Sequence, residues 1–456
     1  MRARAENFRE RLERVVFNPI NQTSKAYYVF LLFLLLVVGF GFYAFVVQFR
    51  FGLLSTGMRD QVIWGLYILD FIFFLGIAMA GTVISAVLRL TSAGWRTPIT
   101  RMAEVVTAAA LMIGALMPII DLGRPDRVWH VLVYGRFQSA ILWDIIVITT
   151  YLTGSLIYLY LPLIPDLAIM RDRLDRNASS LKKKVITYLA VGWRNTEQQR
   201  HRLEKAISIM AVAIIPMAVL THTVASFIFA WMLRPGWNST VYGIYFVIGA
   251  IFSGIATVLI VMAIFRKLYH LEEYITEKHF RYLSYLLLTL LLVYLYLVVT
   301  EYLTIGYKLQ IEEKELLSLL FLGKASFYFW FFIVAGFVIP GFLLVSRIGK
   351  TIPRIIAAAI SVNAAMWVSR LLIVVPTLQV PQMSELIGTY KPTWVEWAIT
   401  GAAFAGFMLV FAIVVKLIPI VSIWEVAEEA ELEAAPQHSS VLTDAQAQLS
   451  RVRGQG

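Results

Sequence analysis

Four ionisable side chains lie within or at the ends of long apolar stretches of this sequence: Asp70, Asp121, Asp144 and His222. Burying an ionisable side chain in apolar surroundings costs free energy, so we expect each of these residues to have a function. Carboxylates and an imidazole can hydrogen-bond to hydroxyl groups and accept their protons. A quinol held in an apolar cleft needs acceptors for two hydroxyl protons. We therefore predict a quinol or quinone site here, with His222 and Asp144 as its main proton acceptors.

Four other polar residues also lie within or near the apolar stretches. Arg370 either extends to the membrane surface or neutralises a buried carboxylate. Glu104, Glu301 and Asn363 are the residues from which a proton path could be built. The simplest alternative is that all these groups only hydrogen-bond helices to one another. The residues alone therefore leave three functions open: quinol chemistry, proton or ion transport, and passive anchoring of a complex.

Membrane-spanning helices must position these residues. The 456-residue chain is 59% hydrophobic and 15% charged, and its mean hydropathy is +0.73. Soluble domains are about 45–50% apolar and about 25% charged. The excess gathers in runs of about 20 residues, the length that crosses a bilayer as a helix. We predict an all-α integral membrane protein with ten transmembrane helices, at residues 26–47, 62–88, 102–120, 140–163, 207–231, 243–265, 282–300, 326–345, 355–375 and 394–416.

The distribution of basic residues predicts the orientation of these helices. Ten crossings place both termini on one side, where the connecting segments hold 29 Lys and Arg, against 11 on the other side. The positive-inside rule then puts the N- and C-termini in the cytoplasm and the protein in the cytoplasmic (inner) cell membrane. In this orientation Asp70, Asp121, Asp144 and His222 all lie in the outer half of the bilayer.

Several classes of cofactor and partner are excluded. The chain has no Cys, so it holds no disulfide and no cysteine-ligated iron–sulfur cluster. Of its six His only His222 lies in a predicted span, which argues against a bis-histidine haem. We also find no metal-site pattern and no phosphate-binding loop. The formal charge of +11 belongs to cytoplasmic loops rather than to a nucleic-acid surface.

The sequence divides into three segments. Residues 1–25 form a basic cytoplasmic N-terminus, 26–416 the membrane domain and 417–456 a tail that we expect to be mostly disordered. Within the domain, the long cytoplasmic loop 164–206 is expected to carry surface helices at 181–190 and 200–205. Segments 301–326 and 376–393 are long enough to hold short interfacial helices.

Motifs in this framework resemble the NrfD/PsrC family, the membrane subunits of polysulfide reductase and its relatives. The resemblance covers predicted spans two to ten and rests on several stretches in combination. They are WGLYI at 64–68, GIAMAGTVISA at 76–86, PIIDLGRP at 118–125, SAILWD at 139–144, HTVASF at 222–227, RPGWNST at 234–240, YFVIGAIFSGIA at 245–256, RLLIVVP at 370–376 and PTWVEW at 392–397. The last two are similar to a ten-span branch that includes the ActC protein of alternative complex III.

The resemblance implies a fold, a site and partners. It implies two four-helix bundles, spans 2–5 and 6–9, flanked by spans 1 and 10. It places a quinol site in the first bundle near the outer face, where Asp144, His222 and Arg370 match residues of the ActC-like site. It implies a ferredoxin-like iron–sulfur subunit and a catalytic or cytochrome subunit as partners, and it allows a second NrfD-like subunit.

The sequence also departs from ActC. Asp121 and Met79 stand where His is expected, and Ile228 stands where an acidic residue is expected. With these departures in view, we predict a quinol-interacting membrane subunit of a respiratory oxidoreductase that is not catalytic alone. Menaquinone or ubiquinone is its substrate, Asp70 and Asp121 serve as relay or neighbouring groups, and the electrons leave to an iron–sulfur subunit. The alternatives are a proton- or ion-translocating subunit and a passive anchor.

Overall fold

In the part of the chain that the structure describes, ten helical segments are long and apolar enough to cross a membrane. The computed structural model describes residues 17, 20, 23–173, 180–345, 351–381 and 389–426 of the chain. The helices that could cross a membrane match the predicted spans in number and order. They are α2 (Lys25–Phe51), α3 (Leu66–Gly81), α5 (Thr97–Asp121), α7 (Ala140–Tyr160), α10 (Glu197–Ala230), α11 (Tyr242–Leu268), α12 (Glu277–Lys308), α14 (Ser326–Ile333) continued by α15 (Ile339–Val345), α16 (Ile352–Gln379) and α17 (Trp394–Leu417). The prediction of an all-α, ten-span protein is confirmed.

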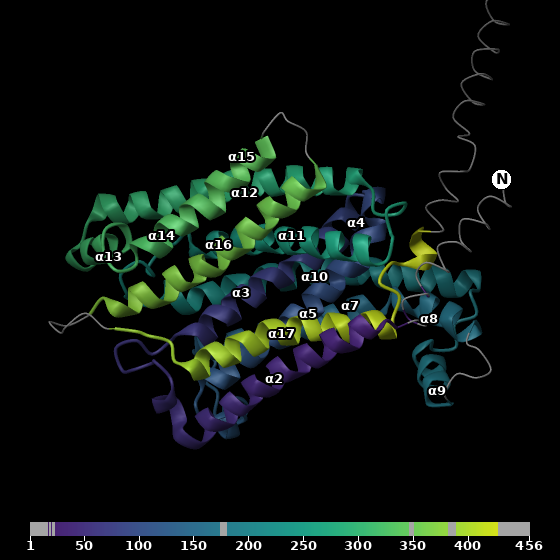
Figure 1. Ribbon diagram of the computed structural model, residues 1–456, viewed down its shortest axis with the longest axis horizontal. Coiled ribbons are helices and arrows are strands. Elements are labelled where there is room, and N and C mark those ends of the chain that lie inside the picture. Colours follow the sequence, from purple (N-terminus) through teal and green to yellow (C-terminus); the bar gives the residue numbers. More distant parts are fainter. Residues whose placement is uncertain are drawn as a thin grey trace, which may run out of the picture.

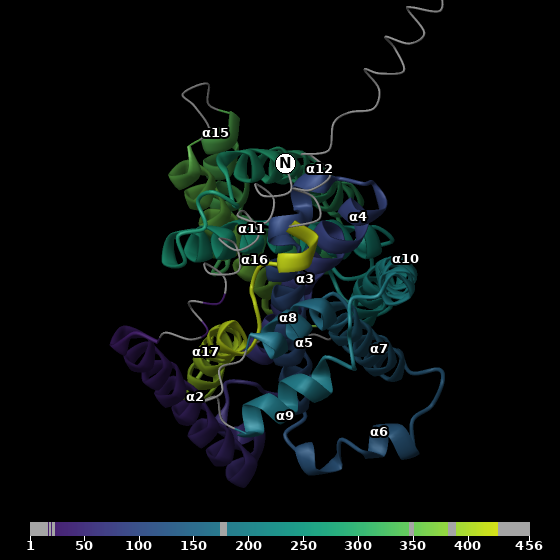
Figure 2. The ribbon, with the colours of Figure 1, turned by 90° about the vertical axis from the view of Figure 1, so that its right-hand side faces the viewer.

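Helix packing produces the two predicted bundles (Figure 1). Helices α3, α5, α7 and α10 form the first bundle, and α11, α12, α14 with α15, and α16 form the second. Helix α3 packs against α11 and α16, so the bundles meet along it. Helices α17 and α2 pack side by side at the flank of the first bundle (Figure 2). All residues of α3 are buried, which makes it the central helix of the molecule.

Two spans contain a π-helical turn. In the second span it is η2 (Thr82–Val87), followed by α4 (Leu88–Leu90), and in the eighth it is η5 (Val334–Val338). Such turns widen the helix by one residue and often occur at functional sites. Proline lies inside α5, α10 and α16. Because proline has no N–H, the carbonyl four residues earlier loses its usual partner.

The short helices correct part of the sequence interpretation. Helix α8 (Leu163–Asp172) and helix α9 (Ser180–Leu189) follow the fourth span, and α9 matches the expected helix at 181–190. Helix α13 (Ile311–Phe321) confirms a helix within 301–326. The expected separate helix at 200–205 is wrong, because those residues form the first turns of α10. Thr196 caps that helix by accepting a hydrogen bond from the Gln199 N–H at 3.3 Å.

Helix α2 begins and α17 ends on the same side of the molecule, which we call the terminal side (Figure 1). The predicted orientation makes this side cytoplasmic, and that orientation stays a prediction. Residues 418–426 of the expected disordered tail are placed against the first bundle, and several of their side chains are buried. Residues 427–456 lie outside the described residues, as does most of the basic N-terminus.

Candidate functional site

His222 is buried between α10 and α3. Its Nδ1 lies 2.7 Å from the carbonyl oxygen of Ala218, and its Nε2 lies 2.9 Å from that of Leu75 on α3. A neutral imidazole has one N–H, whereas the protonated ring has two. Only the protonated ring therefore donates to both carbonyls. The site is built so that proton uptake by His222 completes a second hydrogen bond from the ring to the helix backbone.

Asp144 lies on the neighbouring helix of the same bundle. It is 6% exposed, and its Oδ1 is buried without a hydrogen-bond partner among the described residues. A buried polar atom without a partner is costly, so it calls for a proton, a water molecule or a ligand. The Tyr151 ring, seven residues further along α7, contacts the His222 ring at 6.5 Å between centroids. Asp144 therefore lies about 10 Å along the helix from that level and is not directly bonded to His222.

Arg370 is buried where the two bundles meet. It is 1% exposed, and its Cζ lies 5.2 Å from the centroid of the Phe246 ring on α11. Within the part of the chain that the structure describes, its Nη1 has no hydrogen-bond partner and no carboxylate forms an ion pair with it. His222 and Arg370 approach adjacent residues of α3, since the His222 Nε2 bonds the Leu75 carbonyl and the Arg370 Nη2 lies beside Gly76. A desolvated cation of this kind favours an anionic or electron-rich ligand nearby.

Two glycines allow Arg370 to occupy this position. A Cβ at Gly249 would lie 3.1 Å from the Arg370 Nη2 and 3.0 Å from the Tyr294 ring. A Cβ at Gly76 would lie 3.9 Å from the same nitrogen and 3.2 Å from the Ser253 hydroxyl. Both glycines belong to stretches that carry the family resemblance. They let the backbones of α3 and α11 approach the guanidinium.

We expect Gly249→Val to displace the Arg370 side chain, because the added methyl groups would occupy the space of the guanidinium and of Tyr294. Overpacking of this kind costs about 1–3 kcal/mol. The expected result is a lower unfolding temperature in detergent together with weaker binding of a quinol analogue. Gly243→Ala is the matched control on the same helix, since its Cβ would make ordinary contacts at 3.6 Å or more. Equal behaviour of the two variants would contradict this account.

Asp70 faces away from α7 and α10. Its Oδ1 accepts a hydrogen bond from the Trp367 indole on α16 at 2.9 Å, and its Oδ2 accepts one from the Thr400 hydroxyl on α17 at 2.6 Å. The carboxylate therefore joins the central helix to two others, as expected of polar residues that hold membrane helices together.

Asp121 ends α5 on the flank of α2. The adjacent Ile120 carbonyl accepts a hydrogen bond from Gln48 of α2 at 2.8 Å. The Asp121 Oδ1 is buried and unpartnered within the described part of the chain. The structure thus places the predicted site residues in two regions. His222 and Arg370 both lie against α3 and Asp144 lies on α7 of the first bundle, whereas Asp70 and Asp121 lie toward α2 and α17.

A line of hydroxyl groups continues from His222 toward the terminal side. The Tyr151 hydroxyl donates to the Ala78 carbonyl at 2.9 Å and lies 2.7 Å from the Thr82 hydroxyl. One turn further, the Ser85 hydroxyl lies 2.5 Å from Oε1 of Glu104 and 3.1 Å from the Tyr158 hydroxyl. We call Thr82, Tyr151, Ser85, Tyr158 and Glu104 the inner polar column.

Sequence reasoning found only Glu104 of this column. The hydroxyls of Thr82 and Ser85 share the π-helical turn η2. The signal that could have identified them is two hydroxyl residues three apart in an otherwise apolar span. Tyr151 and Tyr158 are also seven residues apart, so they lie on one face of α7.

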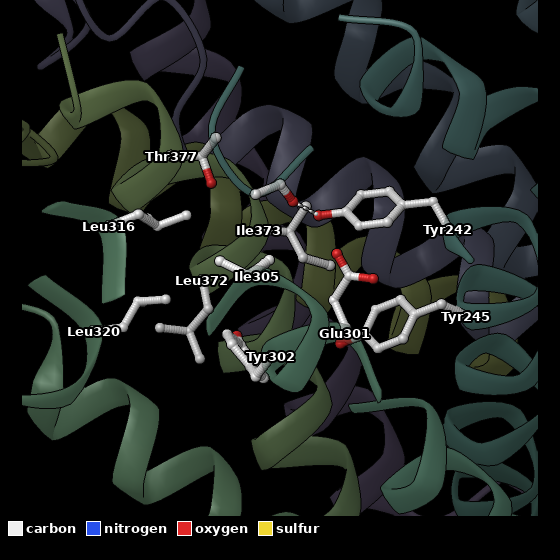
Figure 3. Close-up of a pocket in the computed structure, with 11 residues that line it drawn as sticks. Tyr242, Tyr245, Glu301, Tyr302, Ile305, Leu316, Leu320, Leu372, Ile373 and Thr377 are labelled. Atoms are coloured by element: carbon white, nitrogen blue, oxygen red, sulfur yellow. Dashed lines mark hydrogen bonds between the residues drawn. The ribbon is translucent and has the colours of Figure 1, made fainter. Parts of the chain in front are cut away.

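Glu301 and Asn363 lie in the second bundle. Glu301 accepts a hydrogen bond from the Ser239 hydroxyl at 2.6 Å and lines a pocket near the opposite end from the terminal side. Figure 3 shows Glu301 with Tyr242 and Tyr245 on one side of this pocket and leucines on the other. Its free space is about 30 Å³, enough for about two water molecules and too small for a quinol headgroup.

Asn363 ties α16 to α11 through a 3.0 Å contact between its amide and the Thr257 hydroxyl. It belongs to the second bundle, whereas Glu104 lies in the first. The structure therefore does not place the three candidate proton-path residues on one route.

Comparison with known proteins gives a consistent family. Residues 54–382 match the family described as "Polysulphide reductase, NrfD". A selenate reductase subunit of Mesobacillus selenatarsenatis is 26% identical over 417 residues, 87% of this chain and 94% of the relative. A putative dimethyl sulfoxide reductase membrane subunit of Halobacterium salinarum is 30% identical over 229 residues, about half of each chain. The Hdr-like menaquinol oxidoreductase integral membrane subunit of Archaeoglobus fulgidus is 23% identical over 436 residues, 91% of this chain and all of the relative.

The family match covers most of the ten-helix domain, from the end of α2 to the residues after α16. It includes every element that carries His222, Asp144, Arg370 and the inner polar column. The resemblance inferred from the sequence motifs is confirmed, and this chain belongs to the polysulphide reductase NrfD family of multi-pass membrane proteins.

Proposed function

We propose that this chain is the quinol-interacting membrane subunit of a respiratory oxidoreductase complex in the cytoplasmic membrane. The observation that carries the proposal is the presence of three buried polar groups with unsatisfied or protonatable atoms on α7, α10 and α16. Among the described residues they are a carboxylate with an unpartnered oxygen, an imidazole that gains a hydrogen bond when protonated, and an arginine without a counter-ion. The name of the Archaeoglobus relative, a menaquinol oxidoreductase subunit, supports menaquinone in preference to ubiquinone.

These groups suit the chemistry of a quinol. Its oxidation releases two electrons and two protons as two O–H bonds break and two C=O bonds form. The protons go to His222 and to the Asp144 carboxylate, while the positive charge of Arg370 stabilises negative charge that develops on the headgroup oxygens. Quinone reduction runs the same steps in reverse.

The electrons need an acceptor outside this chain. In the described ranges no three or more His, Asp and Glu residues gather as a possible metal site. The relatives are named as subunits of reductases and of an oxidoreductase, which supports partner subunits for this chain too. We propose a ferredoxin-like iron–sulfur subunit bound at the extracytoplasmic face, beside the outer ends of α7 and α10, and a catalytic or cytochrome subunit beyond it.

Asp144→Asn tests this function. The amide keeps the shape of the side chain but cannot accept a proton, and the buried Oδ1 has no partner to lose among the described residues. We expect quinol oxidation by the assembled complex to fall at least about tenfold, with subunit composition unchanged. Asp126→Asn, which alters an exposed ion pair with Arg124, is the control. Full turnover by the Asp144→Asn complex would leave a passive anchor as the function.

A second candidate function is proton movement coupled to quinol chemistry, and the inner polar column favours it. Its hydroxyls and Glu104 extend from the level of His222 to the terminal side within one bundle. Hydroxyl and carboxyl groups in sequence can pass protons through an apolar domain.

Ser85→Ala interrupts the column by removing the hydroxyl that joins Glu104 to Tyr158. We expect it to slow proton uptake from the terminal side in liposomes several-fold while quinol analogue binding stays normal. Thr150→Ala, on the exposed face of α7, is the control. Unchanged proton uptake in the Ser85→Ala complex would exclude this column as the route.

A further inference from the structure

The terminal end of the first bundle is closed by the residues that follow α17. The Arg101 guanidinium on α5 forms a buried ion pair with Asp166 of α8 and donates to the Ser422 hydroxyl at 3.2 Å. Asp166 accepts a hydrogen bond from the Trp424 N–H at 3.1 Å. These contacts fix the backbone on both sides of residue 423. The position of Glu425 is therefore determined by the fold.

Glu425 lies beside the inner polar column, and one of its two carboxylate oxygens lacks a hydrogen-bond partner among the described residues. It is 8% exposed, its Oε1 forms an ion pair with Arg89, and its Oε2 is buried with no hydrogen-bond partner among the described residues. Glu104 has the same arrangement. Its Oε1 bonds the Ser85 hydroxyl, and its buried Oε2 is likewise unpartnered in the described structure. Their partners Ser85 and Arg89 lie four residues apart in the second span, about one turn, so the two carboxylates lie near each other at the terminal end of the column, where like charges repel.

The charges around this pair do not remove the repulsion. Arg89 is engaged by Glu425 and Arg101 by Asp166, so within the described ranges Glu104 is left with a serine hydroxyl and without a direct ion pair. Arg96 directs its Nη1 to the Thr100 hydroxyl at 3.3 Å. The groups that act on the two carboxylates from the packed elements are Ser85, Arg89, Arg96, Arg101 and Tyr158.

We propose that Glu104 and Glu425 form a proton-binding pair that connects the inner polar column with water on the terminal side. The pair carries two negative charges when empty and one when a proton is bound. The bound proton turns one carboxylate into a carboxylic acid, whose O–H supplies the donor that an unpartnered oxygen lacks. Glu425, at the edge, exchanges the proton with water, and Glu104 passes it to the hydroxyls of Ser85 and Tyr158.

This inference extends the second candidate function, but its test reads protonation directly and needs no quinol turnover. The full-length chain is placed in liposomes and titrated with acid while infrared difference spectra record the carboxylic C=O band. Among the bands of the buried carboxylic acids we expect one in the wild type that disappears in Glu104→Gln, while those of Asp144 and the other buried acids remain. In Glu425→Gln the negative neighbour is gone, so Glu104 should hold its proton less tightly. Its titration should then move to lower pH by about one unit, a tenfold loss of proton affinity.

Ser422→Ala is the matched control, because it removes a hydrogen bond from the same segment without altering a carboxylate. Its band should titrate as in the wild type. If Glu425→Gln does not accumulate, Glu425→Asp is the substitute. Its side chain is one methylene group shorter, so its charge lies farther from Glu104 and the titration should shift in the same direction. A Glu104 band that titrates identically with and without the Glu425 carboxylate would overturn the proposal and leave Glu425 as an anchor for Arg89. That result would not affect the quinol site, which the Asp144 variant tests separately.

Discussion

Replacing Arg101 by Ala is expected to lower the free energy of unfolding by about 3–5 kcal/mol, because it leaves Asp166 buried without its counter-ion. Arg101 and Asp166 are both almost completely buried. Burial already raises the pKa of the Asp166 carboxyl despite the guanidinium beside it. The substitution also removes the hydrogen bond to Ser422, so it detaches the residues after α17. Unfolding of the purified chain in mixed detergent micelles measures the loss.

Two further variants distinguish the cost of leaving a buried charge unpaired from the cost of losing an arginine side chain. Arg124→Ala breaks an ion pair that is largely exposed and should leave the free energy of unfolding nearly unchanged. The double variant Arg101→Met with Asp166→Leu removes both charges and should recover part of the stability, because apolar replacement of a buried pair is often neutral but the Trp424 N–H loses its acceptor. If Arg101→Ala were no more harmful than Arg124→Ala, the buried Arg101–Asp166 ion pair would not stabilise the fold.

Replacing His222 by Gln is expected to reduce quinol oxidation by the assembled complex about 10²–10⁴-fold, the usual contribution of a positioned proton acceptor. The glutamine amide can still donate to one of the two carbonyls, on Leu75 or Ala218, so the packing of α10 against α3 is retained. It cannot bind the proton. The measurement is quinol oxidation by the purified complex with an artificial electron acceptor.

Thr223→Ala is the control for this prediction. Its hydroxyl bonds the Val219 carbonyl of its own helix at 2.8 Å, so its removal alters α10 one residue from His222 without touching the site. We expect near-normal turnover from it. Turnover by the His222→Gln complex equal to that of Thr223→Ala would remove His222 from the reaction.

Hydropathy predicted the membrane helices well because each span is long and apolar. The boundaries that it missed were set by local hydrogen bonds. Helix α10 starts at Glu197 rather than near residue 207, since Thr196 caps a polar first turn that hydropathy does not register. The same limit applies to residues 418–426. The sequence predicted a mostly disordered tail here, whereas Arg89 and Arg101 provide partners for Glu425 and Ser422 that only the fold brings near.

The site was harder to predict because sequence gives the depth of a residue in a span but not the direction of its side chain. Helix α3 is buried on every face, so apolar periodicity carries no information about its rotation. Asp70 was therefore assigned to the same site as Asp144, as a relay or neighbouring group, although it bonds Trp367 and Thr400 on the other side of α3. The inner polar column was not predicted because Ser, Thr and Tyr are common in membrane helices. Its hydroxyl groups line up only because two of them lie in the π-helical turn η2.

The contact of residues 418–426 with the first bundle has a consequence for biogenesis. Helix α5 and helix α8 leave the ribosome long before Trp424, whose backbone N–H donates to the buried Asp166 carboxylate. Until translation passes that point, the end of the bundle lacks part of its hydrogen bonding. A nascent chain that stalls before residue 424 should thus remain open to membrane proteases, so that completion of synthesis and resistance to degradation coincide.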